Sequence, residues 1–162
     1  MSAPTVIFDC VTFLQALANQ NGPAAKCWGY ARNGRVSLHV CQPILDEVAD
    51  VLRRPKLAQK FGFTEQIVQS FLEEIARIAV IVAKVPSQFS FARDPKDEPY
   101  INLALAIKAS HIVTWDKDLL DLMDENSAVG QSLRTLHVDL VIMTPPAFLS
   151  AIESQTAIEG SP

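Results

Sequence analysis

Carboxylates stand at the ends of several apolar segments of this sequence, where the chain would leave a buried core. Two of them follow short apolar runs, one lies within a helical pattern and one opens such a pattern: Asp9, Asp116, Glu47 and Asp97. Two carboxylates about 4 Å apart repel each other by about 4 kcal/mol at an effective dielectric of about 20. If the fold gathers these acids, they need bound cations, raised pKa values, or both.

Oxygen ligands without His or Cys favour hard divalent cations, and therefore Mg²⁺ or Mn²⁺. Such an ion can activate a water molecule, and two ions about 3.5–4 Å apart can hold a phosphodiester during its transfer. His39, His111 and His137 lie outside the acidic motifs, where no Ser–His or Cys–His pair suggests a covalent intermediate. The residues therefore favour hydrolysis of a phosphodiester by a metal-activated water.

Each acid also has a structural interpretation. Asp9, Asp97 and Asp116 could cap the helices that follow them, and Glu47 could be a solvated helix residue. Capping and metal binding are compatible. Three neighbouring residues are auxiliary candidates, of which the first could equally be a cap: Asp94, Thr114 and Asp118. Substrate contact is expected from scattered cations: Arg53, Arg54, Lys56 and Arg93.

Alternating strands and helices must position these residues. The expected strands are 6–8, 36–40, 79–83, 112–113 and 140–143, and the expected helices are 11–18, 23–33, 43–53, 56–61, 65–78, 100–109, 119–123 and 145–152. Residues 124–139 are expected to form a polar surface excursion. The alternation predicts an α/β fold, a three-layer sandwich with a parallel sheet of about five strands. The strands' carboxyl ends would share one rim, where the acids meet.

The composition suits one globular domain. The chain has 162 residues, of which 49% are hydrophobic and 20% are charged. We expect a single domain over residues 1–153 and a disordered tail over residues 154–162. The formal net charge of −4 argues against a protein that coats nucleic acid, but not against an enzyme that acts on it.

The cysteines and the apolar runs indicate a cytoplasmic protein. Cys10, Cys27 and Cys41 are odd in number and lack C-x-x-C spacing, which indicates reduced thiols and neither a zinc site nor a disulfide framework. No signal-peptide pattern opens the chain, and its longest apolar run is too short for a membrane span.

Several motifs, taken in order, resemble those of a known family. They are Val6-Ile7-Phe8-Asp9, Pro43-Ile44-Leu45-Asp46-Glu47-Val48, Leu52-Arg53-Arg54-Pro55-Lys56-Leu57, Arg93-Asp94-Pro95-Lys96-Asp97, Ile112-Val113-Thr114-Trp115-Asp116-Lys117-Asp118-Leu119-Leu120 and Thr144-Pro145-Pro146-Ala147-Phe148-Leu149. Over residues 5–152 the sequence resembles a PIN domain, nearest to the branch described as toxins of toxin–antitoxin systems. Each motif alone is weak, whereas their order and spacing together are specific.

The resemblance implies a Mg²⁺- or Mn²⁺-dependent ribonuclease with a PIN-like parallel sheet. It places the family's four acids, as catalytic residues and metal ligands, at Asp9, Glu47, Asp97 and Asp116. The implied partners are RNA, an antitoxin protein and a second copy of the chain in a homodimer.

The sequence departs from the family pattern directly after the first Asp. The family usually has Thr or Ser and then Asn there, where this chain has Cys10 and Val11. An alternative function is therefore a PIN fold that binds RNA or protein with an impaired catalytic site. The run Phe8–Thr12 also resembles the opening of haloacid-dehalogenase phosphatases, but the second Asp that these enzymes need is replaced by Val11.

Overall fold

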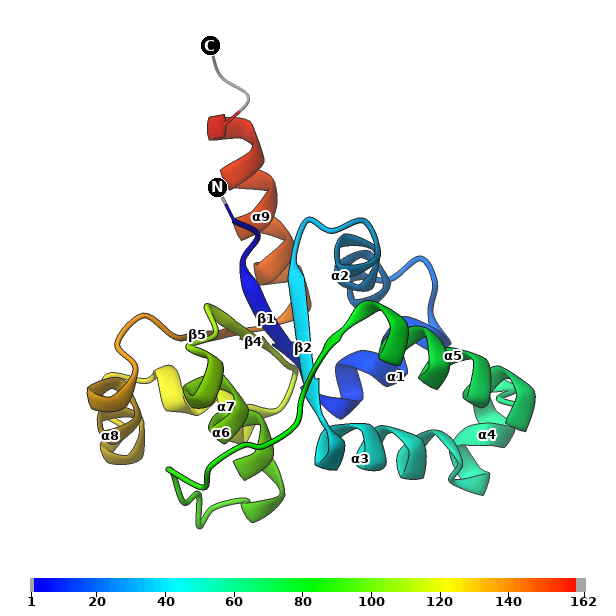
Figure 1. Ribbon diagram of the computed structural model, residues 1–162, viewed down its shortest axis with the longest axis horizontal. Helices are drawn as coiled ribbons and strands as arrows, with labels where there is room; N and C mark the ends of the chain where they lie inside the picture. Colours follow the sequence, from blue (N-terminus) through cyan, green and yellow to red (C-terminus); the bar gives the residue numbers. More distant parts are fainter. Residues whose placement is uncertain (1, 160–162) are drawn as a thin grey trace.

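The computed structural model describes residues 2–159 of the chain. Its strands form one sheet of five, in the order β3-β2-β1-β4-β5, and all neighbouring strands are parallel. The strands are β1 (Thr5–Phe8), β2 (Ser37–Cys41), β3 (Val80–Val82), β4 (His111–Val113) and β5 (Val141–Met143). Helices flank this sheet (Figure 1), so the predicted α/β class with a central parallel sheet is confirmed.

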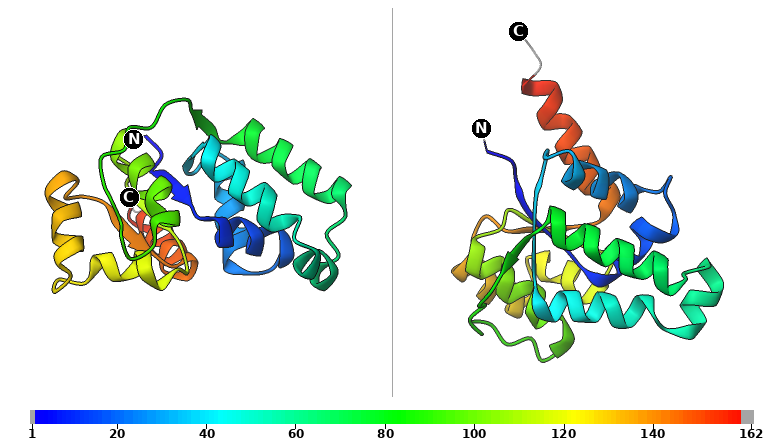
Figure 2. Two further views of the ribbon diagram at one scale, coloured as in Figure 1. Left: turned by 90° about the horizontal axis from the view of Figure 1, so that it is seen from below. Right: turned by 45° about the vertical axis from the view of Figure 1, so that its right-hand side comes forward.

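The helices fall into two groups along the chain. The first group lies between β1 and β3 and contains α1 (Cys10–Ala18), α2 (Pro23–Arg32), α3 (Gln42–Leu52), α4 (Pro55–Phe61) and α5 (Glu65–Ile78). The second group contains α6 (Glu98–Ile107), α7 (Lys117–Leu120), α8 (Ala128–Leu136) and α9 (Pro145–Glu159), with the short 3₁₀ turns η1 (Pro95–Asp97) and η2 (Asp121–Met123). Figure 2 shows that α9 extends toward the end of the molecule where β1 begins.

The two central strands are apolar on both faces because helices cover both sides of the sheet. Val6, Ile7 and Phe8 of β1 have no exposed surface, and neither have Ile112 and Val113 of β4. Burial of a side chain of this size contributes about 1.5–3 kcal/mol. This burial fixes the positions of the carboxyl ends of β1 and β4 in the core, and therefore the positions of the residues that follow them.

An aromatic cluster holds α1 against the sheet. The ring of Phe13 packs edge to face on Phe8, Trp28 and Phe71, with centroid distances of 5.5, 6.3 and 6.5 Å. Such pairs add about 0.5–1.5 kcal/mol each beyond the burial of area. The cluster therefore sets the position of the N-terminus of α1, where Asp9 lies.

The order of the strands reverses between β1 and β4. The chain builds β2 and β3 on one side of β1, and then crosses to place β4 on the other side, with Phe8 paired to Val113. Ligands of open α/β sheets bind outside the carboxyl ends of the strands at such a switch point. Asp9 follows β1 directly and Asp116 follows β4 closely, so both lie at this point.

Two predictions about the second half of the chain are wrong. Residues 124–139 contain α8, whose N-cap Ser127 accepts a hydrogen bond from the backbone N–H of Gly130. Only Gly130 and Leu133 of this helix are buried, but its apolar residues do gather on one face, so the sequence carried a helical period here. A Cβ atom at Gly130 would lie 2.1 Å from the carbonyl oxygen of Leu122, so only glycine allows the helix to approach η2 this closely.

The last helix is longer than predicted. α9 continues to Glu159, so residues 154–159 of the expected disordered tail are helical, while residues 160–162 lie outside the described part. The side chain of Thr156 donates a hydrogen bond to the carbonyl oxygen of Ile152 and accepts one from Arg35, which ties this extension to the body. Among residues 2–159, no helix combines the length and the apolar character that a membrane span requires.

Candidate active site

Five carboxylates gather where β1 and β4 end. Oxygen atoms of Asp94, Asp97 and Asp116 all lie within 4.8 Å of one another. Asp9 lies close enough to Asp97 and Glu47 that its charge raises the pKa of both carboxyl groups. The structure therefore brings together the four acids that the sequence singled out, and adds Asp94 to them.

Asp97 is the most constrained member of this cluster. Its side chain is only 6% exposed, and among the described residues its Oδ2 atom is buried without a hydrogen-bond partner. Burial and the adjacent carboxylate of Asp116 raise its pKa to about 8, with further contributions from Asp94 and Asp9. A buried carboxylate oxygen with no donor, facing other carboxylates, has the arrangement expected of a cation ligand.

Two threonine hydroxyls orient Asp9. Thr12 donates to its Oδ1 over 2.6 Å, and Thr114 donates to its Oδ2 over 2.5 Å. The backbone N–H of Thr12 also donates to Oδ1 over 2.9 Å, so Asp9 is the N-cap of α1 as well. Burial raises the pKa of Asp9, and the hydrogen bonds from the threonines oppose this rise. Thr12 therefore fixes the carboxylate direction even though the sequence lacks the family's Asn at position 11.

Thr114 links the ends of the two central strands. Its hydroxyl accepts a hydrogen bond from the backbone N–H of Asp116 over 2.9 Å while it donates to Asp9. Asp116 caps α7 by accepting from the N–H of Asp118, and Asp94 caps η1 by accepting from the N–H of Lys96. The capping interpretation is therefore confirmed for Asp9, Asp94 and Asp116, whereas the side chain of Asp97 makes no capping hydrogen bond at α6.

Glu47 is held by a residue that the sequence did not single out. The phenol of Tyr100 donates to Oε2 of Glu47 over 2.9 Å and accepts from the backbone N–H of Cys10 over 3.1 Å. Tyr100 is 1% exposed, and burial followed by the charge of Glu47 raises its pKa far above the usual range. A signal was available: Tyr100 lies three residues after Asp97, in a helix whose other polar residues are Glu98 and Asn102, and spacing of this kind places side chains on one face.

The predicted auxiliary residue Asp118 forms an ion pair with Arg93. The guanidinium of Arg93 contacts Asp118 over 2.5 Å and Asp121 over 2.9 Å, and Lys117 also binds Asp121. Arg93 immediately precedes Asp94, and Asp118 lies two residues after Asp116. Arg93 thus joins the segments that carry the acids, and its charge is already matched by carboxylates.

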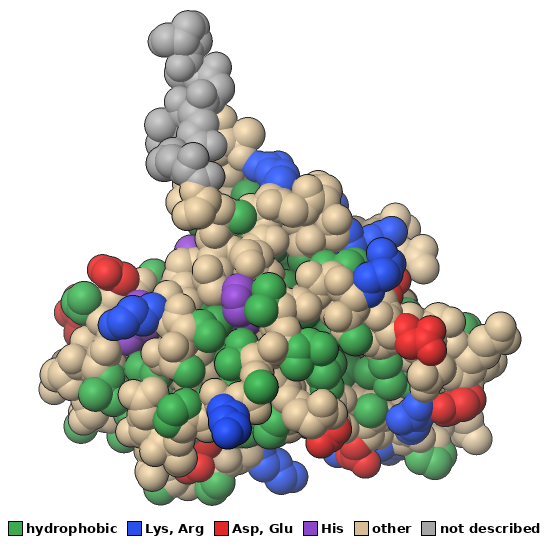
Figure 3. Space-filling model, viewed as in Figure 1, with side chains coloured by type: hydrophobic (Ala, Val, Ile, Leu, Met, Phe, Trp, Pro, Cys, Tyr) green, Lys and Arg blue, Asp and Glu red, His purple; other side chains and the backbone are tan. Residues whose placement is uncertain are grey.

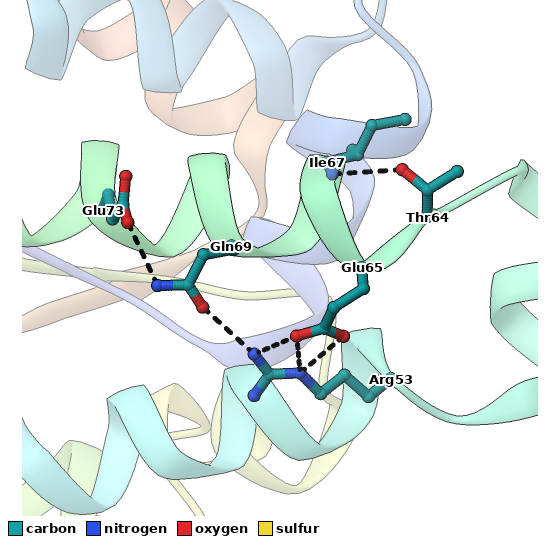
Figure 4. Close-up of polar contacts among 6 residues, drawn as sticks. All are labelled: Arg53, Thr64, Glu65, Ile67, Gln69 and Glu73. Atoms are coloured by element: carbon teal, nitrogen blue, oxygen red, sulfur yellow. Dashed lines mark hydrogen bonds and ion pairs between the residues drawn. The ribbon is translucent and has the colours of Figure 1, made fainter.

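The other predicted substrate cations do not converge. Arg53 binds Glu65 through both carboxylate oxygens and also contacts Gln69 on α5 (Figure 4). Arg54 pairs with Asp50 over 3.1 Å. Lys and Arg side chains are dispersed over the face in Figure 3, with no continuous basic stripe.

A pocket of about 660 Å³ adjoins the cluster of acids and is shared with Glu47. Its described lining includes Arg54 and Lys96, but neither Arg53 nor Lys56. Lys96 is a cation that the sequence reasoning quoted within a motif without giving it a role. Val11 also lines this pocket and is 44% exposed, so it is not part of the core.

These residues fit a divalent cation. The donors are carboxylate oxygens, which suit Mg²⁺ and Mn²⁺. Asp97, whose Oδ2 atom has no hydrogen-bond partner among the described residues, offers one carboxylate oxygen to the close group formed with Asp94 and Asp116. Asp94, Asp97 and Asp116 would be the primary ligands. Asp9 and Glu47 contribute negative charge to the same site.

Comparison with known proteins places the chain in a family. The sequence profile of the PIN domain matches residues 5–118. The chain is also 30% identical, over 148 residues, to an uncharacterized protein of Methanocaldococcus jannaschii, and the match covers 91% of each sequence. The match to the PIN domain agrees with the resemblance seen in the motifs and with the five-stranded parallel sheet of the structure. This chain therefore belongs to the PIN domain family.

Proposed function

We propose that the protein is a Mg²⁺- or Mn²⁺-dependent endoribonuclease that hydrolyses phosphodiester bonds of RNA. PIN domains are generally nucleases that use divalent metals. The observation that carries the proposal is the buried, unpartnered Oδ2 atom of Asp97 beside the carboxylates of Asp94 and Asp116. A binding module without catalysis has no need of this arrangement, because it destabilises the metal-free protein.

In this proposal, different residues of the chain bind the metal ion, orient the carboxylates and attract the RNA. Asp94, Asp97 and Asp116 would hold the divalent ion, which when bound activates a water for attack on phosphorus and stabilises the developing charge. Glu47, oriented by Tyr100, and Asp9, oriented by Thr12 and Thr114, would complete the negative site. Lys96 lies beside Asp97 and would attract the RNA backbone.

Metal-dependent cleavage tests this function directly. Purified protein should cleave a single-stranded RNA when Mn²⁺ or Mg²⁺ is added, and cleavage should stop in excess EDTA and resume when excess metal is restored. Products separated on a denaturing gel provide the measurement. The variant Asp116→Asn controls for contaminating nuclease, because it should be inactive under the same conditions. Cleavage that persists in EDTA, or that Asp116→Asn retains, would refute the proposal.

Restoring the polar residue at position 11 should speed the reaction. Val11→Asn should raise the cleavage rate by about tenfold, because outer-shell polar groups change activity by about 10–100-fold. Val11 is 44% exposed, so an Asn at this position would not be buried without hydrogen-bond partners. The melting temperature should therefore be nearly unchanged. The rate is best measured at saturating RNA, with Val138→Asn, at another exposed site, as the matched control; an unchanged rate would remove position 11 from the site.

We extend the proposal to the protein's setting. A ribonuclease of this branch would act in the cytoplasm as the toxin of a toxin–antitoxin pair, and would assemble as a homodimer. Exposed apolar side chains on the edge strand β3, Val80 and Ile81 at 50% and 48% exposure, are consistent with self-association at a sheet edge.

A further inference from the structure

The pocket beside Glu47 lies between two packed helices, and its lining contains both apolar and charged side chains. Four apolar side chains line it, and we call them the apolar floor of the pocket: Val11 and Leu14 of α1, Val51 of α3 and Leu57 of α4. These side chains are only partly buried, because no other described element covers them. α1 and α3 contact each other along this line (Figures 1 and 2).

Charged groups also line the pocket. Its cations are Lys96 of η1, which directly precedes Asp97 in the sequence, and Arg54, which lies between α3 and α4; its carboxylates are Glu47 and Asp50. Both cations act electrostatically on Glu47: burial raises the pKa of this acid, and the positive charges of Lys96 and Arg54 oppose the rise. Lys96 makes no ion pair within residues 2–159, whereas Arg54 is held by Asp50 in an exposed pair of the kind that contributes little to stability.

We propose that this pocket, which we call the α1–α3 pocket, receives one unpaired nucleotide of RNA next to the bond that is cut. The apolar floor would contact the base, and Lys96 and Arg54 would contact the phosphates on either side of it. The volume of about 660 Å³ lies within the range of about 300–1,000 Å³ that is common for small-molecule sites. This inference rests on the proposed function, and it specifies the substrate as RNA that is single-stranded at the cut.

Two features favour a nucleotide over a protein segment as the occupant. The pocket shares Glu47 with the cluster of acids, so its occupant lies next to whatever reaches those acids, as a neighbouring nucleotide of the same strand would. It also offers the free ammonium group of Lys96, which complements a phosphate. A base can enter only when it is not stacked in a duplex, so the pocket selects against double-stranded RNA.

Binding to a labelled RNA in EDTA tests the pocket without relying on cleavage. The probe is a short fluorescein-labelled single-stranded oligoribonucleotide, compared with the same strand in a blunt duplex, and anisotropy is recorded at several salt concentrations. Lys96→Gln should reduce the slope of log affinity against log salt by about 0.7, the value of one phosphate contact to a single strand. Leu57→Glu should weaken single-strand binding by about fivefold or more, through a lost base contact and added repulsion.

Matched controls lie outside the pocket. Lys84→Gln removes an exposed lysine and Leu136→Glu adds a carboxylate at an exposed leucine, and neither should change the affinity. Leu57 is partly exposed, so Leu57→Glu should have the melting temperature of the wild type. Lys96→Gln changes only a surface side chain, so its result decides the question if Leu57→Glu misfolds.

The outcomes separate this inference from the function. If both variants bind RNA with wild-type affinity, the pocket is not a nucleotide site, even if the enzyme cuts RNA, and a protein segment becomes its expected occupant. An equal loss of affinity for the single strand and the duplex would also overturn the proposal. Absence of any binding by the wild type overturns it too. Selective loss of single-strand binding supports it, even if cleavage itself is never observed.

Discussion

Replacing Asp97 with Asn should abolish divalent-metal binding and at the same time stabilise the metal-free protein. The pKa of Asp97 is raised to about 8, so the folded state binds this proton more tightly than the unfolded state. The free energy of unfolding of the wild type must then fall as pH rises from about 4 to about 8. Asn does not titrate, and its shape matches that of the protonated acid, so the variant should lose less stability over this range.

Urea unfolding in EDTA at pH 5 and pH 8 measures this effect. The difference between wild type and Asp97→Asn should change by at least about 1.4 kcal/mol between the two pH values, the equivalent of one pKa unit. Asp139→Asn, at an exposed acid, should follow the wild type. Calorimetric titration with Mn²⁺ should show that Asp97→Asn binds more than about 100-fold more weakly, beyond the usual range of outer-shell effects. Equal Mn²⁺ affinity would remove Asp97 from the site.

Replacing Tyr100 with Phe should weaken Mn²⁺ binding although Tyr100 is not expected to contact the ion. The change removes one oxygen, which donates to Glu47 and accepts from the N–H of Cys10. Glu47 would lose the bond that fixes its direction, and affinity should fall by about 10–100-fold. The N–H of Cys10 would be left without its acceptor in a buried position, which should lower the free energy of unfolding by about 1–3 kcal/mol.

A double-mutant cycle distinguishes positioning from general damage. If Tyr100 acts through Glu47, Tyr100→Phe should reduce Mn²⁺ affinity much less in a Glu47→Gln background than in the wild type. Tyr30→Phe is the matched control, because Tyr30 uses its ring to contact Arg35. Additive losses in the cycle would mean that Tyr100 serves the fold and not the carboxylate.

The sequence was sufficient for the sheet and for the rim of acids because both depend on local patterns. Short runs rich in β-branched residues, such as Val6–Phe8 and Ile112–Val113, favour buried strands, and the carboxyl ends of parallel strands lie at the same edge of the sheet. Asp9 and Asp116 then have to meet. Their capping roles did not conflict with this prediction, because capping occupies only some of the acceptor sites of a carboxylate.

The remaining features depend on partners that are distant in the sequence. Tyr100 and Glu47 are separated by 53 residues, and no periodicity links them. The ion pairs of the predicted substrate cations depend on distant partners as well: Arg53 and Arg93 find carboxylates on other segments, Glu65 and Asp118, which a count of charges along the chain does not reveal. α8 has a helical period of its own, but its position depends on one glycine that allows close packing against η2.

Because the strand order reverses between β1 and β4, the acids come from two parts of the chain. The part after β3 supplies Asp94, Asp97 and Asp116, which can hold a cation among themselves, and the part before β3 supplies Asp9 and Glu47. Without a cation, repulsion between the two sets weakens the contact of β1 with β4; with one, both sets are attracted to the same charge. A bound ion would therefore stabilise the contact between the two parts of the chain. Its removal by a chelator would make the backbone amides of β1 and β4 exchange with solvent sooner than those of the residues in the aromatic cluster.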